Sequence, residues 1–238
     1  MTNWLRLLTD LVLPADCDAC DRPLVAGHTS ALCAACRAGI VPPTPPLCDR
    51  CGVPIAAAVG CGDCRRRPPT FTTARALGLY RPGHSHSPAL ARAVHALKYR
   101  GRRRVAIALG HLLAEAYPFH EGAILVPVPL HPARLRERGF NQALLLARAL
   151  GRARSLSVAP RALARTRATA PQPGLGFAAR QENLADAFVV RLPADIDGRR
   201  VVLIDDVLTT GATANACSSV LLGAGATRVD VYTVGRAP

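Results

Sequence analysis

The sequence predicts an α/β fold, in which a parallel sheet is flanked by helices and preceded by a small cysteine-rich module. Over residues 71–238, short apolar stretches alternate with stretches of helical periodicity, which is typical of a parallel sheet covered on both faces. Eight of the nine cysteines form four Cys-x-x-Cys pairs within residues 17–64. With 238 residues, of which 50% are hydrophobic, the chain is long enough for one full domain and one accessory module, and is too apolar for a disordered protein.

We therefore divide the chain into residues 1–70, an N-terminal helix with a double zinc-finger module, and residues 71–238, the α/β domain. The helix of the first unit is expected at 4–13, where apolar residues recur at helical spacing. The elements of the second unit are strands at 72–80, 123–128, 187–190, 201–204 and 229–234, and helices at 87–99, 102–117, 141–150 and 213–222. Gly151 and Gly223 are expected to end the last two helices.

The zinc prediction for the first unit comes from the spacing of its cysteines. Two Cys-x-x-Cys turns about a dozen residues apart can present four thiolates to one tetrahedral Zn²⁺. Disulfides are the alternative, but the start of the chain is a poor signal peptide, and paired thiolates in a cytosolic protein favour metal. The spacing therefore predicts two structural zinc sites. Their ligands come either from consecutive Cys-x-x-Cys pairs (17/20 with 33/36, and 48/51 with 61/64) or from interleaved pairs (17/20 with 48/51, and 33/36 with 61/64). The eight ligands are Cys17, Cys20, Cys33, Cys36, Cys48, Cys51, Cys61 and Cys64. The ninth cysteine, Cys217, is expected to be a buried core thiol.

The charge of the chain points to phosphate-bearing ligands. Of the formal net charge of +14, +13 lies in residues 71–238, and Lys98 is the only lysine among thirty basic residues. The run Arg100-Gly101-Arg102-Arg103-Arg104 permits DNA contact, although such a run is more often a solvated helix start. An aromatic content of 4% argues against an extended base-stacking groove for single strands. No apolar run reaches the ~18 residues of a membrane span, so no transmembrane segment is expected.

The most informative stretch is residues 201–213. Four apolar residues form a buried strand, and two carboxylates, Asp205 and Asp206, follow at its C-terminal edge, where open α/β sheets bind ligands. A loop of small and hydroxyl residues then begins a helix, whose N-terminus and backbone N–H groups suit a phosphate. The loop residues are Thr209, Thr210, Gly211, Ala212 and Thr213. This is neither a Walker loop nor a G-x-G-x-x-G motif.

This stretch resembles the 5-phosphoribosyl-1-pyrophosphate (PRPP) loop of type I phosphoribosyltransferases. The resemblance implies that Asp205 and Asp206 bind the ribose hydroxyls, that the 209–213 loop holds the 5′-phosphate, and that Mg²⁺ binds with PRPP. The stretch that ends in Val128 and Pro129 resembles the loop that meets pyrophosphate. Purine-salvage members of the superfamily have an acidic residue where Thr209 stands, so a purine acceptor is less expected and no general base is apparent.

Further motifs in the same order resemble the ComF family, which includes the late competence protein and GntX-like proteins, over nearly the whole chain. These motifs are Leu97-Lys98-Tyr99, residues 126–129, residues 138–142, and residues 165–169 with Gln172, Arg180, Asn183 and Phe188. Residues 161–183 resemble the mobile loop that closes over PRPP. Cations that could stabilise departing pyrophosphate are Lys98, Arg134, Arg138, Arg165 and Arg180.

Three functional hypotheses follow from this resemblance. The first is a Mg²⁺-dependent phosphoribosyltransferase that acts on PRPP and an unknown nucleophile. The second is a PRPP or nucleotide sensor of the same fold that performs no transfer. The third is a protein that handles single-stranded DNA, because ComF-like members are linked to DNA-uptake machinery in natural transformation. The expected location is cytoplasmic, at the inner face of the membrane in the third case.

Overall fold

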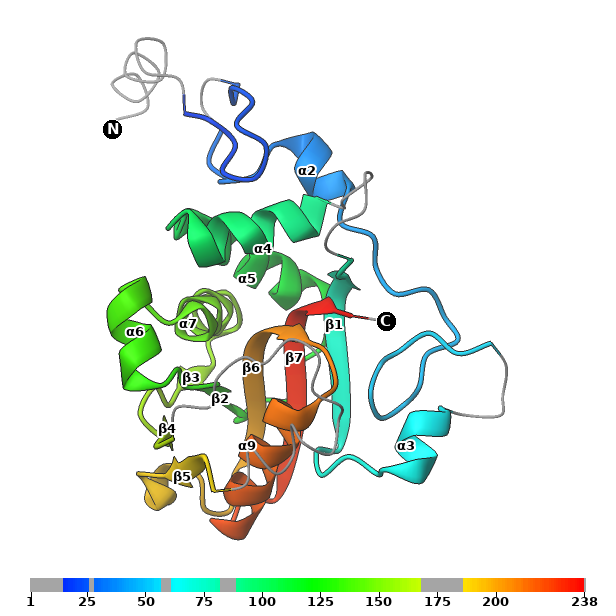
Figure 1. Cartoon of the computed structure of the whole chain (residues 1–238), viewed down its shortest axis with the longest axis vertical. Helices are drawn as coiled ribbons and strands as arrows, with labels where there is room; N and C mark the ends of the chain where they lie inside the picture. The colour runs from blue at the N-terminus through cyan, green and yellow to red at the C-terminus, as the bar shows by residue number, and fades with distance from the viewer. Residues whose placement is uncertain (1–14, 26–27, 57–60, 82–88, 168–185, 238) are drawn as a thin grey trace.

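The computed structural model describes residues 15–25, 28–56, 61–81, 89–167 and 186–237. Its main sheet has five parallel strands in the order β1-β7-β6-β2-β3 (Figure 1). The strands are β1 (Thr73–Leu79), β2 (Ile124–Pro127), β3 (Ser157–Val158), β6 (Arg200–Leu208) and β7 (Arg228–Arg236). The parallel sheet predicted from the sequence is therefore confirmed.

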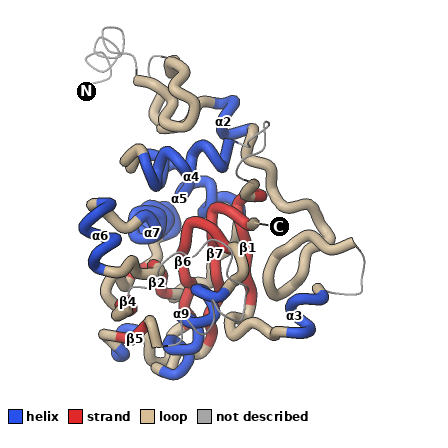
Figure 2. Tube along the Cα trace, in the orientation of Figure 1, coloured by secondary structure: helices blue, strands red, loops and turns tan. Residues whose placement is uncertain are grey.

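Helices cover both faces of this sheet (Figures 1 and 2). The helices α4 (Ala89–Tyr99), α5 (Arg104–Ala116) and α7 (Gln142–Arg154) pack on one face, and α9 (Ala212–Gly223) packs on the other. Side chains of β6 alternate between the two layers, as expected of a strand. Val202 and Ile204 belong to the core with α4, α5 and α7, whereas Val201 and Leu203 belong to the core with α9.

The two halves of the cysteine-rich module occupy different places on this domain (Figure 1). The first cysteine segment (residues 17–36), with α2 (Ala34–Ala38), lies against α4. The second cysteine segment (residues 48–64), with α3 (Gly62–Arg66), lies beside β1 at the sheet edge. There the backbone N–H of Ala74 donates a hydrogen bond to the carbonyl of Arg50 at 2.5 Å.

The helix α7 continues past the glycine that was expected to end it, so that expectation was wrong. Gly151 lies inside α7, and the helix ends at Arg154 with Ser155 in a left-handed conformation. Gly151 serves close packing instead: a Cβ there would lie 2.8 Å from the carbonyl oxygen of Leu156 and 2.9 Å from the side chain of Val158. In contrast, Gly223 is the last residue of α9, as predicted.

The strand β6 is longer than the apolar stretch that predicted it. It runs through both carboxylates to Leu208, because its pairing with β7 continues as far as Leu208 opposite Arg236. Sequence reasoning also missed the short helix α6 (Pro132–Arg138) and the 3-10 helix η1 (Pro193–Asp195).

A small antiparallel pair lies outside the main sheet. It joins β4 (Leu163–Arg165), in a region expected to be a loop, to β5 (Phe188–Val190). The helix expected at 4–13 and most of the loop expected at 161–183 lie outside the described residues. Among the helices of the described residues, none combines the length and the apolar character that a bilayer span requires.

Candidate functional site

The 209–213 loop joins β6 to α9 and borders a small cavity. Gly211 has a φ of 81°, a left-handed conformation that favours glycine, and α9 begins at the next residue. The hydroxyl of Thr210 accepts a hydrogen bond from the backbone N–H of Ala212 at 3.5 Å. The cavity, of about 30 Å³, is lined by all five loop residues and by Asp205. The loop thus leads directly into the N-terminus of α9, the kind of helix end at which anions bind.

Asp205 is the carboxylate on the same face of the sheet as this loop. Its Oδ1 accepts a hydrogen bond from the backbone N–H of Asp206 at 2.8 Å. Burial, and then the neighbouring charge of Asp206, raise the pKa of Asp205 to about 7, against the opposing effects of Lys98 and Arg165. Near neutral pH this carboxyl can therefore exist with or without its proton.

Asp206 faces the other layer of the molecule. Its Oδ2 lies 2.9 Å from Nζ of Lys98, and 6% of the Asp206 side chain and 18% of the Lys98 side chain are exposed. Burial alone would lower the pKa of Lys98, but the carboxylates of Asp206 and Asp205 outweigh it and raise that pKa. The structure thus pairs two residues for which the sequence suggested separate roles.

The residues expected near pyrophosphate lie after β2. The backbone N–H of Val128 donates to the carbonyl of Ile204 at 2.9 Å, and the Val128 carbonyl accepts from the side-chain amide of Asn141 at 3.0 Å. Pro129 follows directly, ahead of α6. This loop therefore lies beside β6 at Ile204, one residue before Asp205.

The arginine candidates occupy three different settings. Arg134, on α6, forms an ion pair with Glu137 at 2.6 Å, on the surface. Arg138 donates to the side chain of Gln142 at 2.8 Å, and its guanidinium lies 5.8 Å from the centre of the Tyr99 ring.

Arg165, on β4, is half-buried; burial lowers its pKa, whereas Cys217 and Asp205 oppose that shift. Arg165 thus lies on the Asp205 face of the sheet. Cys217 is fully buried, as expected of a core thiol, and burial raises its pKa well above the usual value. Arg180 lies outside the described residues.

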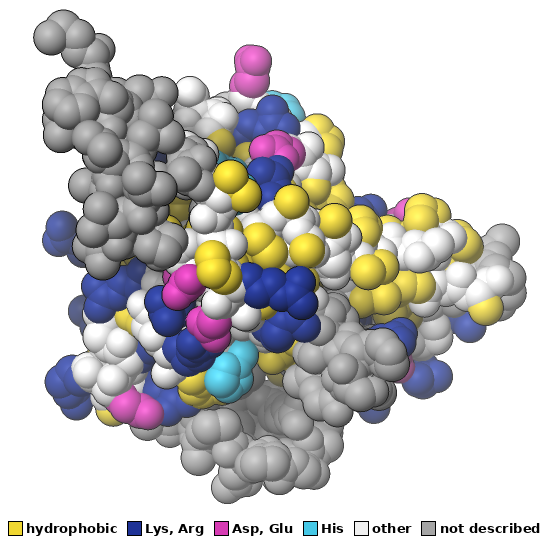
Figure 3. Space-filling model, turned by 90° about the horizontal axis from the view of Figure 1, so that it is seen from above, with side chains coloured by type: hydrophobic (Ala, Val, Ile, Leu, Met, Phe, Trp, Pro, Cys, Tyr) yellow, Lys and Arg dark blue, Asp and Glu magenta, His cyan; other side chains and the backbone are white. Residues whose placement is uncertain are grey.

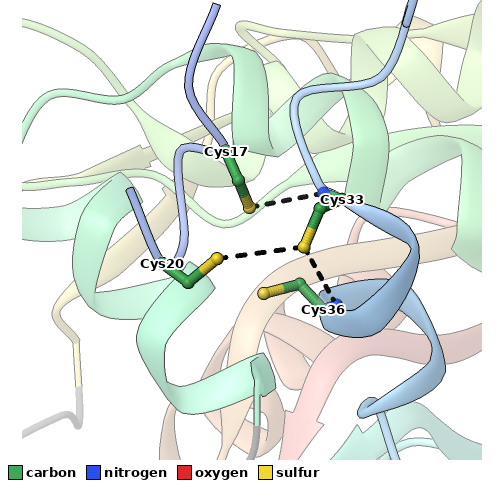
Figure 4. A group of neighbouring side chains, drawn as sticks. All are labelled: Cys17, Cys20, Cys33 and Cys36. Atoms are coloured by element: carbon green, nitrogen blue, oxygen red, sulfur yellow. Dashed lines mark hydrogen bonds between the residues drawn. The ribbon is translucent and has the colours of Figure 1, made fainter. Parts of the chain in front are cut away.

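The first cysteine cluster has the geometry of a zinc site (Figure 4). Four sulfur atoms, from Cys17, Cys20, Cys33 and Cys36, lie within 4.8 Å of one another. The 3.8 Å between the Sγ atoms of Cys20 and Cys33 equals the edge of about 3.8 Å expected for a tetrahedron with Zn–S bonds of about 2.3 Å. Backbone N–H groups of Cys33 and Cys36 also point at cluster sulfurs, at 3.3 and 3.4 Å.

The second cluster repeats this arrangement with Cys48, Cys51, Cys61 and Cys64. Its sulfur atoms lie within 4.8 Å of one another, and 3.8 Å separates those of Cys51 and Cys61. Both groups fit Zn²⁺, and the ligands of each come from consecutive pairs along the chain. The pairing is therefore sequential, and the interleaved alternative is wrong.

The basic run at residues 100–104 contacts the first cysteine segment. Arg100 forms two hydrogen bonds of 2.9 Å with the carboxylate of Asp21. Arg104 donates to both carboxylate oxygens of Asp18, at 3.2 and 3.1 Å, and Asp18 is only 1% exposed. Figure 3 accordingly shows basic side chains lying next to acidic ones on the face seen from above. These arginines thus attach the first cysteine segment to the domain.

Sequence reasoning missed two residues at the 209–213 loop. The guanidinium of Arg236, at the end of β7, donates to the carbonyls of Leu208 and Thr209. Phe71 is 3% exposed, and its ring would lie 3.8 Å from a Cβ on Gly211. No local pattern marks either residue, because both reach the loop only through the pairing of β7 with β6 and the path of the chain before β1.

Two domain models match separate parts of the chain. A model of the double zinc ribbon domain matches residues 8–65, and a model of the phosphoribosyl transferase domain matches residues 138–238. DNA utilization protein YhgH of Escherichia coli (strain K12) is 35% identical over 235 residues, which cover 95% of this chain and 99% of that protein.

Two competence proteins are also similar. Competence protein F of Haemophilus influenzae is 30% identical over 215 residues, which cover 87% of this chain and 90% of that protein. Competence protein ComFC of Bacillus subtilis is 27% identical over 213 residues, with coverage of 86% and 84%. With its two four-cysteine clusters, its parallel sheet and these relatives, the chain belongs to the ComF family, in which a double zinc ribbon precedes a phosphoribosyltransferase domain.

Proposed function

We propose that the protein binds PRPP together with Mg²⁺ and transfers the phosphoribosyl group to a nucleophile. The observation that supports this most is the position of Asp205, whose carboxyl borders the same cavity as the 209–213 loop. A phosphate on the loop and a sugar hydroxyl on the carboxylate are the two ends of a ribose 5-phosphate. One continuous element, from β6 to α9, therefore offers partners to both.

Each of these residues has a defined task in the proposal. The loop N–H groups and threonine hydroxyls donate to the 5′-phosphate. Asp205 accepts hydrogen bonds from the ribose hydroxyls, and the Lys98–Asp206 pair holds α4 against the end of β6. Val128 and Pro129 lie where pyrophosphate would meet the chain, with Arg138 and Arg165 as the candidate cations beside it. In this role Arg134 is a weaker candidate, because it is already paired with Glu137, and Arg180 lies outside the described residues.

The transfer itself exchanges one bond at C1 of the ribose for another. The nucleophile forms a bond to C1 while the bond from C1 to pyrophosphate oxygen breaks, and pyrophosphate leaves with the electron pair. The proton of the nucleophile passes to solvent. When bound, Mg²⁺ would supply positive charge that neutralises departing pyrophosphate. The chain contributes position and positive charge, which stabilise a transition state with oxocarbenium character.

The names of the relatives favour a role connected with DNA. The protein of Escherichia coli is a DNA utilization protein, and that of Haemophilus influenzae is a competence protein. We propose that this chain serves the same process, from the cytoplasmic side. A PRPP or nucleotide sensor without transfer remains the second candidate, because the proposal assigns Asp205, the carboxyl on the loop cavity, to the ribose and assigns no described side chain to the acceptor.

The test is a calorimetric titration of PRPP with Mg²⁺ into wild type, Asp205→Asn and Asp195→Asn. We expect binding to wild type and a loss of affinity of about tenfold to hundredfold for Asp205→Asn, as for a hydrogen bond to a charged group. Asp195 is an exposed carboxylate of η1, so its variant should bind as wild type does. No binding to wild type would contradict the proposal. Binding without pyrophosphate release, over a panel of amine and base nucleophiles, would favour the sensor.

A further inference from the structure

A second and larger cavity lies between the second cysteine segment and the 209–213 loop. Its volume is about 370 Å³. Two zinc ligands, Cys51 and Cys64, line one side, and Thr209, Thr210 and Gly211 line the other. The three loop residues also line the small cavity beside Asp205. The loop thus separates the proposed phosphate site from the second cysteine segment.

Arg236 joins the two sides of this cavity. Its Nε donates to the carbonyl of Cys51 at 3.3 Å. Its Nη1 donates to the carbonyls of Leu208 at 3.2 Å and Thr209 at 2.7 Å, and also contacts that of Ala237. One planar guanidinium therefore holds a zinc ligand's backbone and the entry of the 209–213 loop at a fixed separation.

The chain between the second cysteine segment and β1 also contacts the 209–213 loop and the start of α9. The backbone N–H of Thr70 donates to the side chain of Asn215, in the first turn of α9, at 3.0 Å. Phe71 lies buried under Gly211. In contrast, the contacts of the first cysteine segment described above reach α4 and the start of α5, away from this loop.

We propose that Arg236 is a positioning residue, which makes the shape of the 209–213 loop depend on the second zinc site. With zinc bound, the Cys51 carbonyl is fixed, and Arg236 sets the loop carbonyls relative to it. When the second site loses its metal, the second cysteine segment loses the bond network that fixes Cys51, and the loop loses this support. The inference rests on the proposed function, in that the loop binds the phosphate of PRPP.

Three variants test this role by calorimetry with PRPP and Mg²⁺. Arg236→Met removes the hydrogen bonds to the carbonyls of the second cysteine segment and of the loop. Arg236→Lys keeps the positive charge but loses the planar guanidinium that bonds several carbonyls at once. Arg75→Met is the matched control. Arg75 also donates to a carbonyl of the second cysteine segment, that of Asp49 at 3.0 Å, but its other bond goes to the Ala74 carbonyl of β1 instead of the 209–213 loop. We expect both Arg236 variants to bind PRPP about tenfold to hundredfold more weakly and Arg75→Met to bind as wild type. All three should keep two zinc ions per chain.

Some results would overturn the proposal. Wild-type affinity in Arg236→Met would show that the loop needs no such support. Full rescue by Arg236→Lys would show that Arg236 acts through its charge. A loss of affinity in Arg75→Met as large as in Arg236→Met would point to a general effect of loosening the second cysteine segment.

Hydrogen exchange of residues 205–214 tests the coupling without PRPP, so it separates this proposal from the proposed function. In wild type, a chelator that removes zinc from the second site should speed exchange in the loop. In Arg236→Met, exchange should already be fast and should change little with the chelator. If zinc removal leaves loop exchange unchanged in wild type, the coupling does not exist, whether or not PRPP binds. If the coupling is seen but wild type does not bind PRPP, only the proposed function fails.

Discussion

Asp205 and Asp206 are adjacent in β6, yet their carboxylates serve opposite faces of the sheet. Asp205 borders the cavity of the 209–213 loop, whereas Asp206 is 4% exposed and pairs with Lys98 of α4 at 2.9 Å. Alternation along a strand dictates this separation. Two carboxylates that look equivalent in the sequence therefore differ in their environment, so their substitution should have different consequences.

The first consequence concerns the stability of the Lys98–Asp206 pair. Lys98→Met leaves a buried carboxylate without its partner, so we expect the free energy of unfolding to fall by about 3 kcal/mol. Asp206→Asn should also destabilise the protein, because it leaves the Lys98 charge buried. The double variant should be more stable than the sum of the single changes predicts. Urea unfolding of the four proteins measures this coupling, and additive effects would show that the two side chains do not interact.

The second consequence concerns the pH dependence of Asp205. Its pKa of about 7 is higher in the folded protein than the usual value for aspartate of about 3.9, because burial and Asp206 disfavour its charge. The folded state thus binds more protons than the unfolded state between about pH 4 and 7. Through that interval this group should make the free energy of unfolding fall as pH rises.

The matched variant for this effect is Asp205→Asn, which cannot titrate. Urea unfolding of both proteins between pH 5 and 8 gives two curves, and their difference removes the contributions of groups that do not interact with Asp205. We expect the stability of Asp205→Asn relative to wild type to rise with pH up to about 7 and then to level off. A constant difference over this interval would show that the pKa of Asp205 is not raised.

The parallel sheet and the zinc ligands could be predicted because each has a local signature. Apolar stretches such as residues 201–204 indicate a buried strand whichever strand pairs with it. Each Cys-x-x-Cys pair places two thiolates close together through its own local turn. The pairing of the cysteines could not be settled from spacing, because both arrangements use the same turns. Only the three-dimensional positions of Cys33 and Cys48 relative to Cys17 distinguish them.

The partners of charged residues were harder to predict. The arginines at 100–104 are a basic run in the sequence, but in the structure Arg100 and Arg104 bind Asp21 and Asp18, which lie far away along the chain. Arg236 gives no signal at all, because its role arises from where β7 ends relative to β6. Composition counts charges, whereas function depends on which charges face one another.

A third prediction tests the sequential pairing of the zinc ligands. Replacing all four cysteines of the first cysteine segment with serine should remove one zinc ion per chain and leave the other. The interleaved pairing predicts the loss of both ions, because those four cysteines would supply half of the ligands at each site. Metal analysis of the purified proteins distinguishes these outcomes, and the equivalent change at Cys48, Cys51, Cys61 and Cys64 provides the reciprocal measurement.

The last prediction concerns the contact between the basic run and the first cysteine segment. Asp18 is almost fully buried, so Arg104→Ala leaves its carboxylate, which water reaches poorly, with the longer contact of 3.5 Å to Arg102. We expect a loss of about 1 kcal/mol in the free energy of unfolding. Arg100→Ala should change stability less, because Asp21 is an exposed partner whose pair with Arg100 is screened by water.

The same two variants test whether these arginines contact DNA. Because their guanidinium groups already bind carboxylates, we expect Arg100→Ala and Arg104→Ala to keep the affinity of wild type for single-stranded DNA and the same dependence on salt. Fluorescence anisotropy with a labelled oligonucleotide at several salt concentrations measures both. A tenfold loss of affinity with a shallower salt slope in either variant would instead place DNA on this run. Asp18 and Asp21 of the first cysteine segment would then have to release Arg104 and Arg100 when DNA binds.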